Sequence, residues 1–246
     1  MISSNEKIDS WIINPVWKYK DGYFLPVDWS IINLSNEAEK IIVALQNSPV
    51  QNASVLLRGS IIEQSKPHFA ADIDILILTE NLRKMRFDFS ALTKFGRFLD
   101  IVCIDISNER DDVLYTLAKT RSIHICGNKF SNGKIKVSKQ LLVDHWLKYA
   151  PFRLPNILSS VKNRRLSEVK QIIRSVGIIY FLKYNKFSRD IRTCINWAKI
   201  ESKEIGEEIE QLFKTVSLNE QTTFDIRKIK AWLKFNFYSH INNNLK

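Results

Sequence analysis

Short apolar runs set off by polar or small residues predict strands in the first half of the chain. Four such runs lie at about 54–58, 72–79, 98–105 and 122–126. The segments predicted to be helical are 36–47, for which Ser35 is a capping residue, and about 88–97 and 109–119. Strands that alternate with helices in this way predict a small mixed sheet that carries helices.

The second half has helical spacing throughout. After a polar segment at 128–137 that contains an Asn-Gly turn, apolar residues recur three and four positions apart in the stretches 172–183, 205–213 and 224–242. We therefore expect an α+β protein, with a small mixed-sheet domain over residues 1–130 and an all-α domain over residues 131–246.

Two carboxylates stand inside one of the predicted strands. The preceding strand ends in the turn Gly59-Ser60, and eleven residues separate Ser60 from Asp72. Because side chains alternate between the faces of a strand, Asp72 and Asp74 point to the same face. Two such charges are costly unless a cation neutralises them, and Mg²⁺ is usually held by one or two carboxylates and substrate phosphates. The alternative is a pair of solvated acids on an edge strand, but the aliphatic residues around them favour a buried strand.

Gly-Ser, a gap of about ten residues and Asp-x-Asp among aliphatic residues resemble the signature of the polymerase-β-type nucleotidyltransferase superfamily. The resemblance implies that Gly59 and Ser60 begin a helix that holds the β- and γ-phosphates of a nucleoside triphosphate. It also implies that Asp72 and Asp74 bind two Mg²⁺ ions and that a third carboxylate comes from a neighbouring strand.

The third carboxylate has two candidates in the run 98–105. Asp100 and Asp105 are five positions apart, so they face opposite sides of a strand and at most one joins the site. The superfamily usually places this acid at the start of the strand, which favours Asp100. Arg58, next to the Gly-Ser turn, is open to two interpretations, a phosphate contact or a packing role.

Over about twenty residues, the helical half resembles the C-terminal helices of aminoglycoside adenylyltransferases that act on streptomycin and spectinomycin. The shared pattern is an apolar helix with an aromatic residue, a short turn, and Ser188-Arg189-Asp190 opening a helix that ends near Trp197. Arg189 stands where these enzymes have lysine, and Asp100 stands where they have glutamate. The resemblance implies a phosphate contact from Arg189, and we expect the helical domain to close the nucleotide and acceptor cleft.

The net charge of +11 is concentrated in one part of the chain. The stretch from Lys119 to Lys199 contains 18 Lys or Arg and three acids, a balance of +15, so the remainder is slightly acidic. A basic half beside a carboxylate site suits a triphosphate, an anionic acceptor or both. The plain alternative is that these charges lie on solvated helix faces.

Cysteine usage and the N-terminal residues favour a reducing compartment. Cys103, Cys126 and Cys194 show no Cys-x-x-Cys spacing, which favours neither a zinc site nor a disulfide framework. Cys103 and Cys126 lie in apolar runs, so we expect buried, reduced thiols. The N-terminal residues have no apolar core typical of a signal peptide, and the apolar run 176–182 is too short to span a membrane. We expect a cytoplasmic protein without a membrane partner.

The expected activity is Mg²⁺-dependent transfer of a nucleoside monophosphate, AMP from ATP by resemblance, to an acceptor hydroxyl, with release of pyrophosphate. The first interpretation is a small-molecule acceptor such as an aminoglycoside. The second is the same chemistry on an RNA (tRNA) or protein acceptor, as in toxin-type enzymes, which the basic half favours. The third is a non-catalytic binding module, against which the complete set of turn and carboxylate residues argues.

Overall fold

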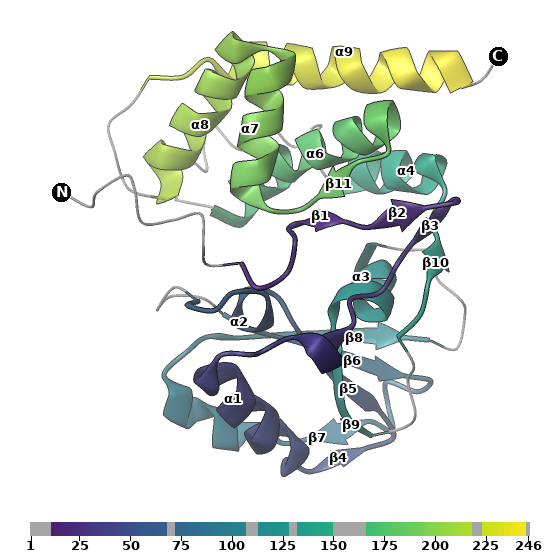
Figure 1. Ribbon diagram of the computed structural model, residues 1–246, viewed down its shortest axis with the longest axis vertical. Coiled ribbons are helices and arrows are strands. Elements are labelled where there is room, and N and C mark those ends of the chain that lie inside the picture. The colour runs from purple at the N-terminus through teal and green to yellow at the C-terminus, as the bar shows by residue number, and fades with distance from the viewer. Residues whose placement is uncertain are drawn as a thin grey trace. The chain divides into compact units, whose positions relative to one another are not determined.

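The structure is a computed structural model that describes residues 11–67, 72–106, 113–127, 132–149, 166–217 and 223–244. It separates into two compact units, one formed by residues 1–14 and 20–136 and the other by residues 15–19 and 137–246. Helices and mixed β-pairing occur together, so the protein belongs to the α+β class (Figure 1). No helix within the described ranges combines the length and apolar character needed to cross a bilayer.

The first unit holds most of the strands, and β2 stands at its boundary with the second. Its strands are β2 (Tyr19–Lys20), β3 (Tyr23–Phe24), β4 (Val50–Gln51), β5 (Ser54–Arg58), β6 (Ile73–Thr79), β7 (Arg86–Phe87), β8 (Leu99–Asp105), β9 (Ile123–Gly127) and β10 (Ile135–Lys136). Its α-helices are α1 (Asn36–Gln46), α2 (Ser60–Glu63) and α3 (Val113–Arg121), and its 3-10 helices are η1 (Trp29–Ile31) and η2 (Ser90–Phe95).

The second unit is mainly helical. Its elements are β1 (Val16–Trp17), α4 (Lys139–Tyr149), α6 (Leu166–Tyr184), β11 (Phe187–Ser188), α7 (Ile191–Glu201), α8 (Lys203–Ser217) and α9 (Ile226–Asn244). It differs from the all-α domain that the sequence predicts, because β11 pairs antiparallel with β1.

Four strands form the main sheet, in the order β8-β6-β5-β9 (Figure 1). β5 pairs antiparallel with both β6 and β9, whereas β6 and β8 run parallel. The sheet is therefore mixed, as the sequence predicts. β6 lies in its interior and β8 at its edge, which decides how far the side chains of each strand are exposed.

Different elements cover the two faces of this sheet. On one face, Ile73, Ile75 and Ile77 of β6 belong to a buried cluster that includes residues of α1, α2 and η2. On the other face, Leu76 and Leu78 pack with Ala118 of α3. Burial on both faces explains why the sequence of β6 is almost continuously apolar.

The structure differs from several of the local predictions. The segment 88–97 contains the 3-10 helix η2 in place of an α-helix, and α3 runs to Arg121, two residues past its expected end. The predicted start of that helix, 109–112, and residues 128–131 of the expected junction lie outside the described residues. Cys103 is exposed, contrary to the expected burial, because β8 is an edge strand.

Candidate active site on the mixed sheet

Three charged side chains form a row across adjacent strands of the main sheet. Arg58, the last residue of β5, pairs with Asp74 of β6, and Asp74 pairs with Asp100 of β8. Residues directly opposite on neighbouring strands project to the same face, here the face that also carries Leu56 and Leu76. Because β6 is an interior strand, Asp74 is not a solvated residue on a sheet edge.

One guanidinium nitrogen of Arg58 forms ion pairs with both acids of the row. Arg58 Nη2 lies 3.1 Å from Oδ1 of Asp74 and 3.5 Å from Oδ2 of Asp100. The side chains of Arg58 and Asp74 are 14% and 20% exposed, whereas that of Asp100 is 45% exposed. The Nε of Arg58 is buried and has no hydrogen-bond partner among the described residues. Charge, more than a full set of hydrogen bonds, therefore holds this guanidinium.

The buried position of Asp74 changes its acidity. Its pKa is raised from 3.8 to about 6, chiefly by burial, and the charges of Asp100 and Asp72 and a hydrogen bond with Asp100 act in the same direction. The charge of Arg58 opposes this rise in pKa but does not cancel it. Near neutral pH the site therefore holds negative charge at a free-energy cost, which a further cation would reduce.

Gly59 lets the backbone pass directly beside Asp74. Its φ is +81°, which other residues rarely adopt, and a Cβ at this position would overlap the Asp74 carboxylate. Ser60 then begins the single-turn helix α2, in which the Gly59 carbonyl accepts hydrogen bonds from Ile62 and Glu63, both at 3.1 Å. The first amides of such a turn have no partner within the helix. The Gly-Ser turn and the carboxylate row are thus one continuous surface feature.

A buried ion pair fixes the far end of α2. Arg121 Nε donates to Glu63 Oε1 at 2.9 Å, and its Nη1 donates to the carbonyl of Asn14 at 3.1 Å. The side chains of Arg121 and Glu63 are only 5% and 14% exposed. Breaking such a pair leaves an uncompensated buried charge, so it holds α2 against the end of α3. Sequence reasoning missed this pair, since 58 positions separate its members and no local pattern joins them.

The remaining acids divide between the site and the rest of the sheet. Asp72 immediately precedes β6 and is exposed, and its charge acts on Asp74. Asp105 lies at the opposite end of β8 from Asp100, and strand alternation directs it to the other face. The structure thus brings Asp74 and Asp100 together with Asp72 beside them, and it leaves Asp105 apart.

Arg189 belongs to the second unit, in the link between β11 and α7. The prediction that Ser188 opens the helix is wrong. Ser188 is buried in β11, and Asp190 caps α7 by accepting a hydrogen bond from the Thr193 amide at 2.8 Å. Arg189 therefore precedes the helix, and its carbonyl accepts a hydrogen bond from Arg174 Nε at 3.2 Å. Its contact with a nucleotide stays a prediction.

The two carboxylates of the row, with Asp72 beside them, are of the chemical type that binds a hard divalent cation. Carboxylate oxygens are ligands that Mg²⁺ prefers, and the burial that raises the pKa of Asp74 makes a further cation favourable beside it. Within the described part of the chain, no group of three or more His, Cys, Asp or Glu side chains is arranged as a metal cage. The guanidinium of Arg58 contacts both Asp74 and Asp100, so an ion shared by these two acids would be repelled by its positive charge.

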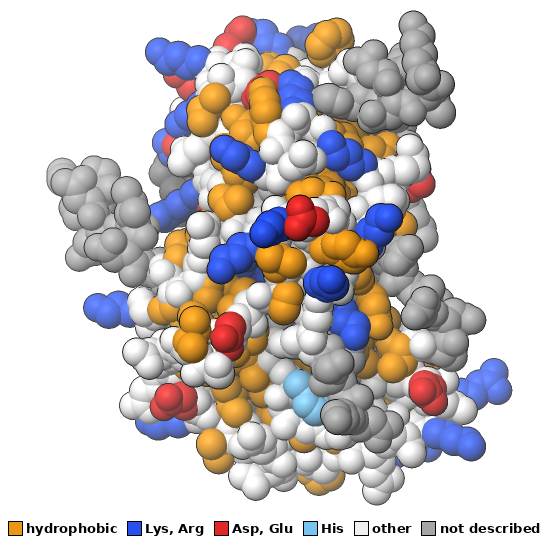
Figure 2. Space-filling view, turned by 45° about the vertical axis from the view of Figure 1, so that its right-hand side comes forward, with side chains coloured by type: hydrophobic (Ala, Val, Ile, Leu, Met, Phe, Trp, Pro, Cys, Tyr) orange, Lys and Arg blue, Asp and Glu red, His pale blue; other side chains and the backbone are white. Residues whose placement is uncertain are grey.

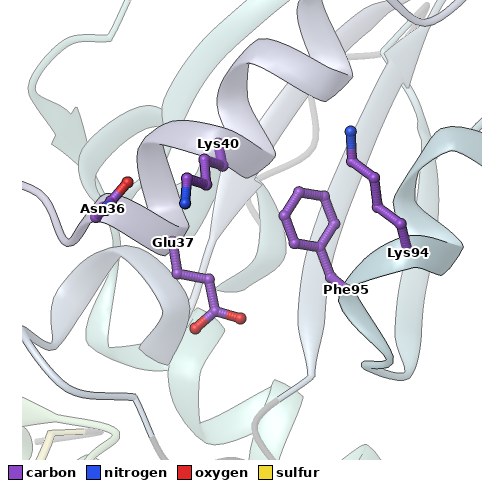
Figure 3. Close-up of a pocket in the computed structure, with 5 residues that line it drawn as sticks. All are labelled: Asn36, Glu37, Lys40, Lys94 and Phe95. Carbon is purple, nitrogen blue, oxygen red and sulfur yellow. The ribbon is translucent and has the colours of Figure 1, made fainter.

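A surface pocket of about 700 Å³ lies elsewhere on the first unit (Figure 3). Its lining residues are Asn36, Glu37 and Lys40 of α1 and Lys94 and Phe95 of η2. The Phe95 ring lies between the α1 side chains and Lys94, whose ammonium is 5.4 Å from the ring centroid. Because α1 and η2 cover the sheet face opposite to Asp74, this pocket is not part of the carboxylate row.

Comparison with known proteins does not assign the chain to a family. No protein-family model matches the chain, and no curated protein matches it significantly. The functional assignment therefore depends on the residues of the site itself.

Proposed function

We propose that the protein is a Mg²⁺-dependent nucleotidyltransferase that moves a nucleoside monophosphate, AMP from ATP in the first instance, to an acceptor hydroxyl. The observation that supports this most directly is the register of Asp74 and Asp100 on adjacent parallel strands, with the Gly59 turn packed against Asp74. Two acids on one sheet face beside a glycine turn favour a catalytic site over a binding module without catalytic function.

Each acid has a distinct role in this proposal. Asp72, Asp74 and Asp100 would hold two Mg²⁺ ions, which when bound stabilise the attacking and leaving oxygens of an in-line displacement. Asp100 is the more exposed acid of the row and would accept the proton of the acceptor hydroxyl. The hydroxyl oxygen bonds to the α-phosphorus while the bond from that phosphorus to the β-phosphate oxygen breaks, so pyrophosphate leaves.

The first unit would hold the triphosphate at its glycine turn. The backbone amides of the turn at Gly59 and the hydroxyl of Ser60 would contact the β- and γ-phosphates, since amides at the start of a helical turn lack internal partners. A charge-assisted contact from Arg189 is a separate hypothesis, which only the resemblance to aminoglycoside adenylyltransferases supports. The first candidate acceptor is a small molecule with a free hydroxyl, such as an aminoglycoside.

An RNA acceptor is the second candidate, and helix α9 favours it. None of the nineteen residues of α9 is acidic, and it presents Phe235 and Tyr238, which are 72% and 46% exposed. Lys230 and Lys234 lie one helical turn apart on the same helix. Cations beside exposed rings suit phosphates and stacked bases. On the face shown in Figure 2, basic side chains are interspersed with apolar ones.

The proposal is tested by labelling. The full-length protein is incubated with Mg²⁺, each α-³²P nucleoside triphosphate in turn, and either an aminoglycoside panel or total tRNA. We expect label to enter one acceptor class with equimolar pyrophosphate release, and no label with the Asp74→Asn variant. Absence of label with every nucleotide and acceptor, or equal labelling by Asp74→Asn, would contradict the proposal.

A further inference from the structure

Arg58 differs from the other buried arginines of the first unit in how it is held. Arg97 donates from Nε and Nη2 to the two oxygens of Glu37 at 2.6 and 2.7 Å, a two-point contact. Arg121 donates from Nε to Glu63 and from Nη1 to a backbone carbonyl. Arg58 instead directs one nitrogen, Nη2, at two acids. The Arg58 guanidinium is therefore held more by the charges of the acids than by a two-point hydrogen-bonded contact.

The oxygens that Arg58 contacts are those a metal ion would need. Asp74 Oδ2 faces Gly59, where a Cβ would overlap it, so Oδ1 is the oxygen directed along the row. Mg²⁺ binds oxygen at about 2.0–2.1 Å. A guanidinium nitrogen at 3.1 and 3.5 Å from Asp74 Oδ1 and Asp100 Oδ2 neutralises the same two oxygens. An ion shared by these oxygens would lie close to the guanidinium, so the two cations repel each other and compete for the acids.

We infer that Arg58 is a built-in counter-cation of the carboxylate site, which stabilises the metal-free protein and competes with a divalent ion for Asp74 and Asp100. The row stays neutralised in both states, by the guanidinium first and by the ion afterwards. Once displaced, the guanidinium is close enough to the Gly59 turn to pair with a phosphate of the incoming nucleotide. This last step rests on the proposed function, whereas the exchange of cations rests only on metal binding.

If the two cations compete, removing the charge of Arg58 should lower the Tm of the metal-free protein and tighten its binding of metal. Arg58→Met keeps much of the side-chain volume and removes the charge. In EDTA we expect a lower Tm, because the two acids lose their counter-cation. In calorimetric titration with Mg²⁺ or Mn²⁺ without nucleotide, we expect tighter metal binding, by about tenfold or more, because the competing charge is gone. Arg58→Lys, which retains the charge, should stay near the wild type in both measurements.

Two further measurements keep the inference testable if Arg58→Met folds poorly. Arg83→Met removes an exposed arginine of the same unit and should change neither property, which controls for overall charge. In the wild-type protein, the arginine Nε–H NMR signal that is absent from Arg58→Lys should shift on addition of Mg²⁺.

The possible outcomes separate the inference from the proposed function. Metal affinity unchanged or weakened in Arg58→Met, or an Arg58 signal unmoved at saturating Mg²⁺, would overturn the inference, as would failure of both proteins to bind metal. Cation exchange observed in a protein that labels no acceptor would support the inference and reject nucleotidyl transfer.

Discussion

Asp74 and Arg58 are direct cross-strand neighbours on interior strands, and their side chains meet at 3.1 Å. This contact places a positive charge beside an acid whose pKa is nevertheless raised to about 6, because burial outweighs the attraction. A site that retains a costly charge in its resting state is suited to bind cations.

Asp74→Asn should abolish nucleotidyl transfer, by about a thousandfold or more, because a metal ligand is lost. The Tm of the metal-free variant should be unchanged or higher, since Asn removes a buried charge that is repelled by Asp72 and Asp100. Transfer assays and thermal unfolding in EDTA measure the two effects. Activity close to wild type would remove Asp74 from the site, and a large fall in Tm would show that its charge is structural.

The stability of the metal-free protein should depend on the protonation of Asp74. The folded protein binds this proton more tightly than the unfolded chain, so Asp74 adds stability as the pH falls from about 6 towards 4. A pKa difference of about two units corresponds to about 3 kcal/mol. Other carboxylates act oppositely. The pKa of Glu37 is lowered by its hydrogen bond with Arg97, so its contribution is lost as the pH falls below 4.5. Urea unfolding of wild type and Asp74→Asn across this range isolates the Asp74 contribution as their difference.

Gly59→Ala should destabilise the protein by about 3 kcal/mol or more, because it combines a strained backbone with a collision against the Asp74 carboxylate. Gly96→Ala is the matched control, since Gly96 has a φ of +62° and open space around its Cβ position. It should cost about 1 kcal/mol. Chemical denaturation compares them, and equal losses would show that the approach to Asp74 is unimportant.

Asp100→Ala should remove transfer activity, and Asp105→Ala should leave most of it. The reason is that Asp100 pairs with Asp74 on the site face, while Asp105 lies at the other end of β8. Steady-state kinetics with saturating Mg²⁺ tests both, with Tm recorded to exclude unfolding. An inactive Asp105→Ala together with an active Asp100→Ala would transfer the role of the third acid to Asp105.

If the acceptor is RNA, the double variant Lys230→Glu/Lys234→Glu should weaken binding of single-stranded RNA by about tenfold or more, because two phosphate contacts become repulsive. Lys186→Glu/Lys203→Glu, at exposed positions of the same unit, carries the same change in net charge. Fluorescence anisotropy at two salt concentrations compares them. Equal weakening in both would mean that overall charge, and not α9, governs binding, and no RNA binding by the wild type would favour the small-molecule acceptor.

The sequence by itself determined the local features of the site. Alternation along a strand is set by covalent geometry, so the spacing of Asp72 and Asp74 predicts a common face, although Asp72 lies one residue before β6. The apolar run of β6, its burial and the capped start of α1 at Ser35 likewise follow from neighbouring residues. Ser35 accepts the expected hydrogen bond from the Ala38 amide at 3.1 Å. The same reasoning failed at Ser188, where pairing with β1 overrides the local helix-start pattern.

Only the tertiary structure decided which residues meet. Strand order and register place Arg58 and Asp100 on either side of Asp74, and they depend on packing between segments that are far apart in the chain. The Glu63–Arg121 pair and the exposure of Cys103 on an edge strand have the same origin. The periodicity of apolar residues predicts which face of a strand a side chain occupies, because neighbouring residues share one backbone. It does not predict which strand lies alongside, because strand order depends on burial of the whole core.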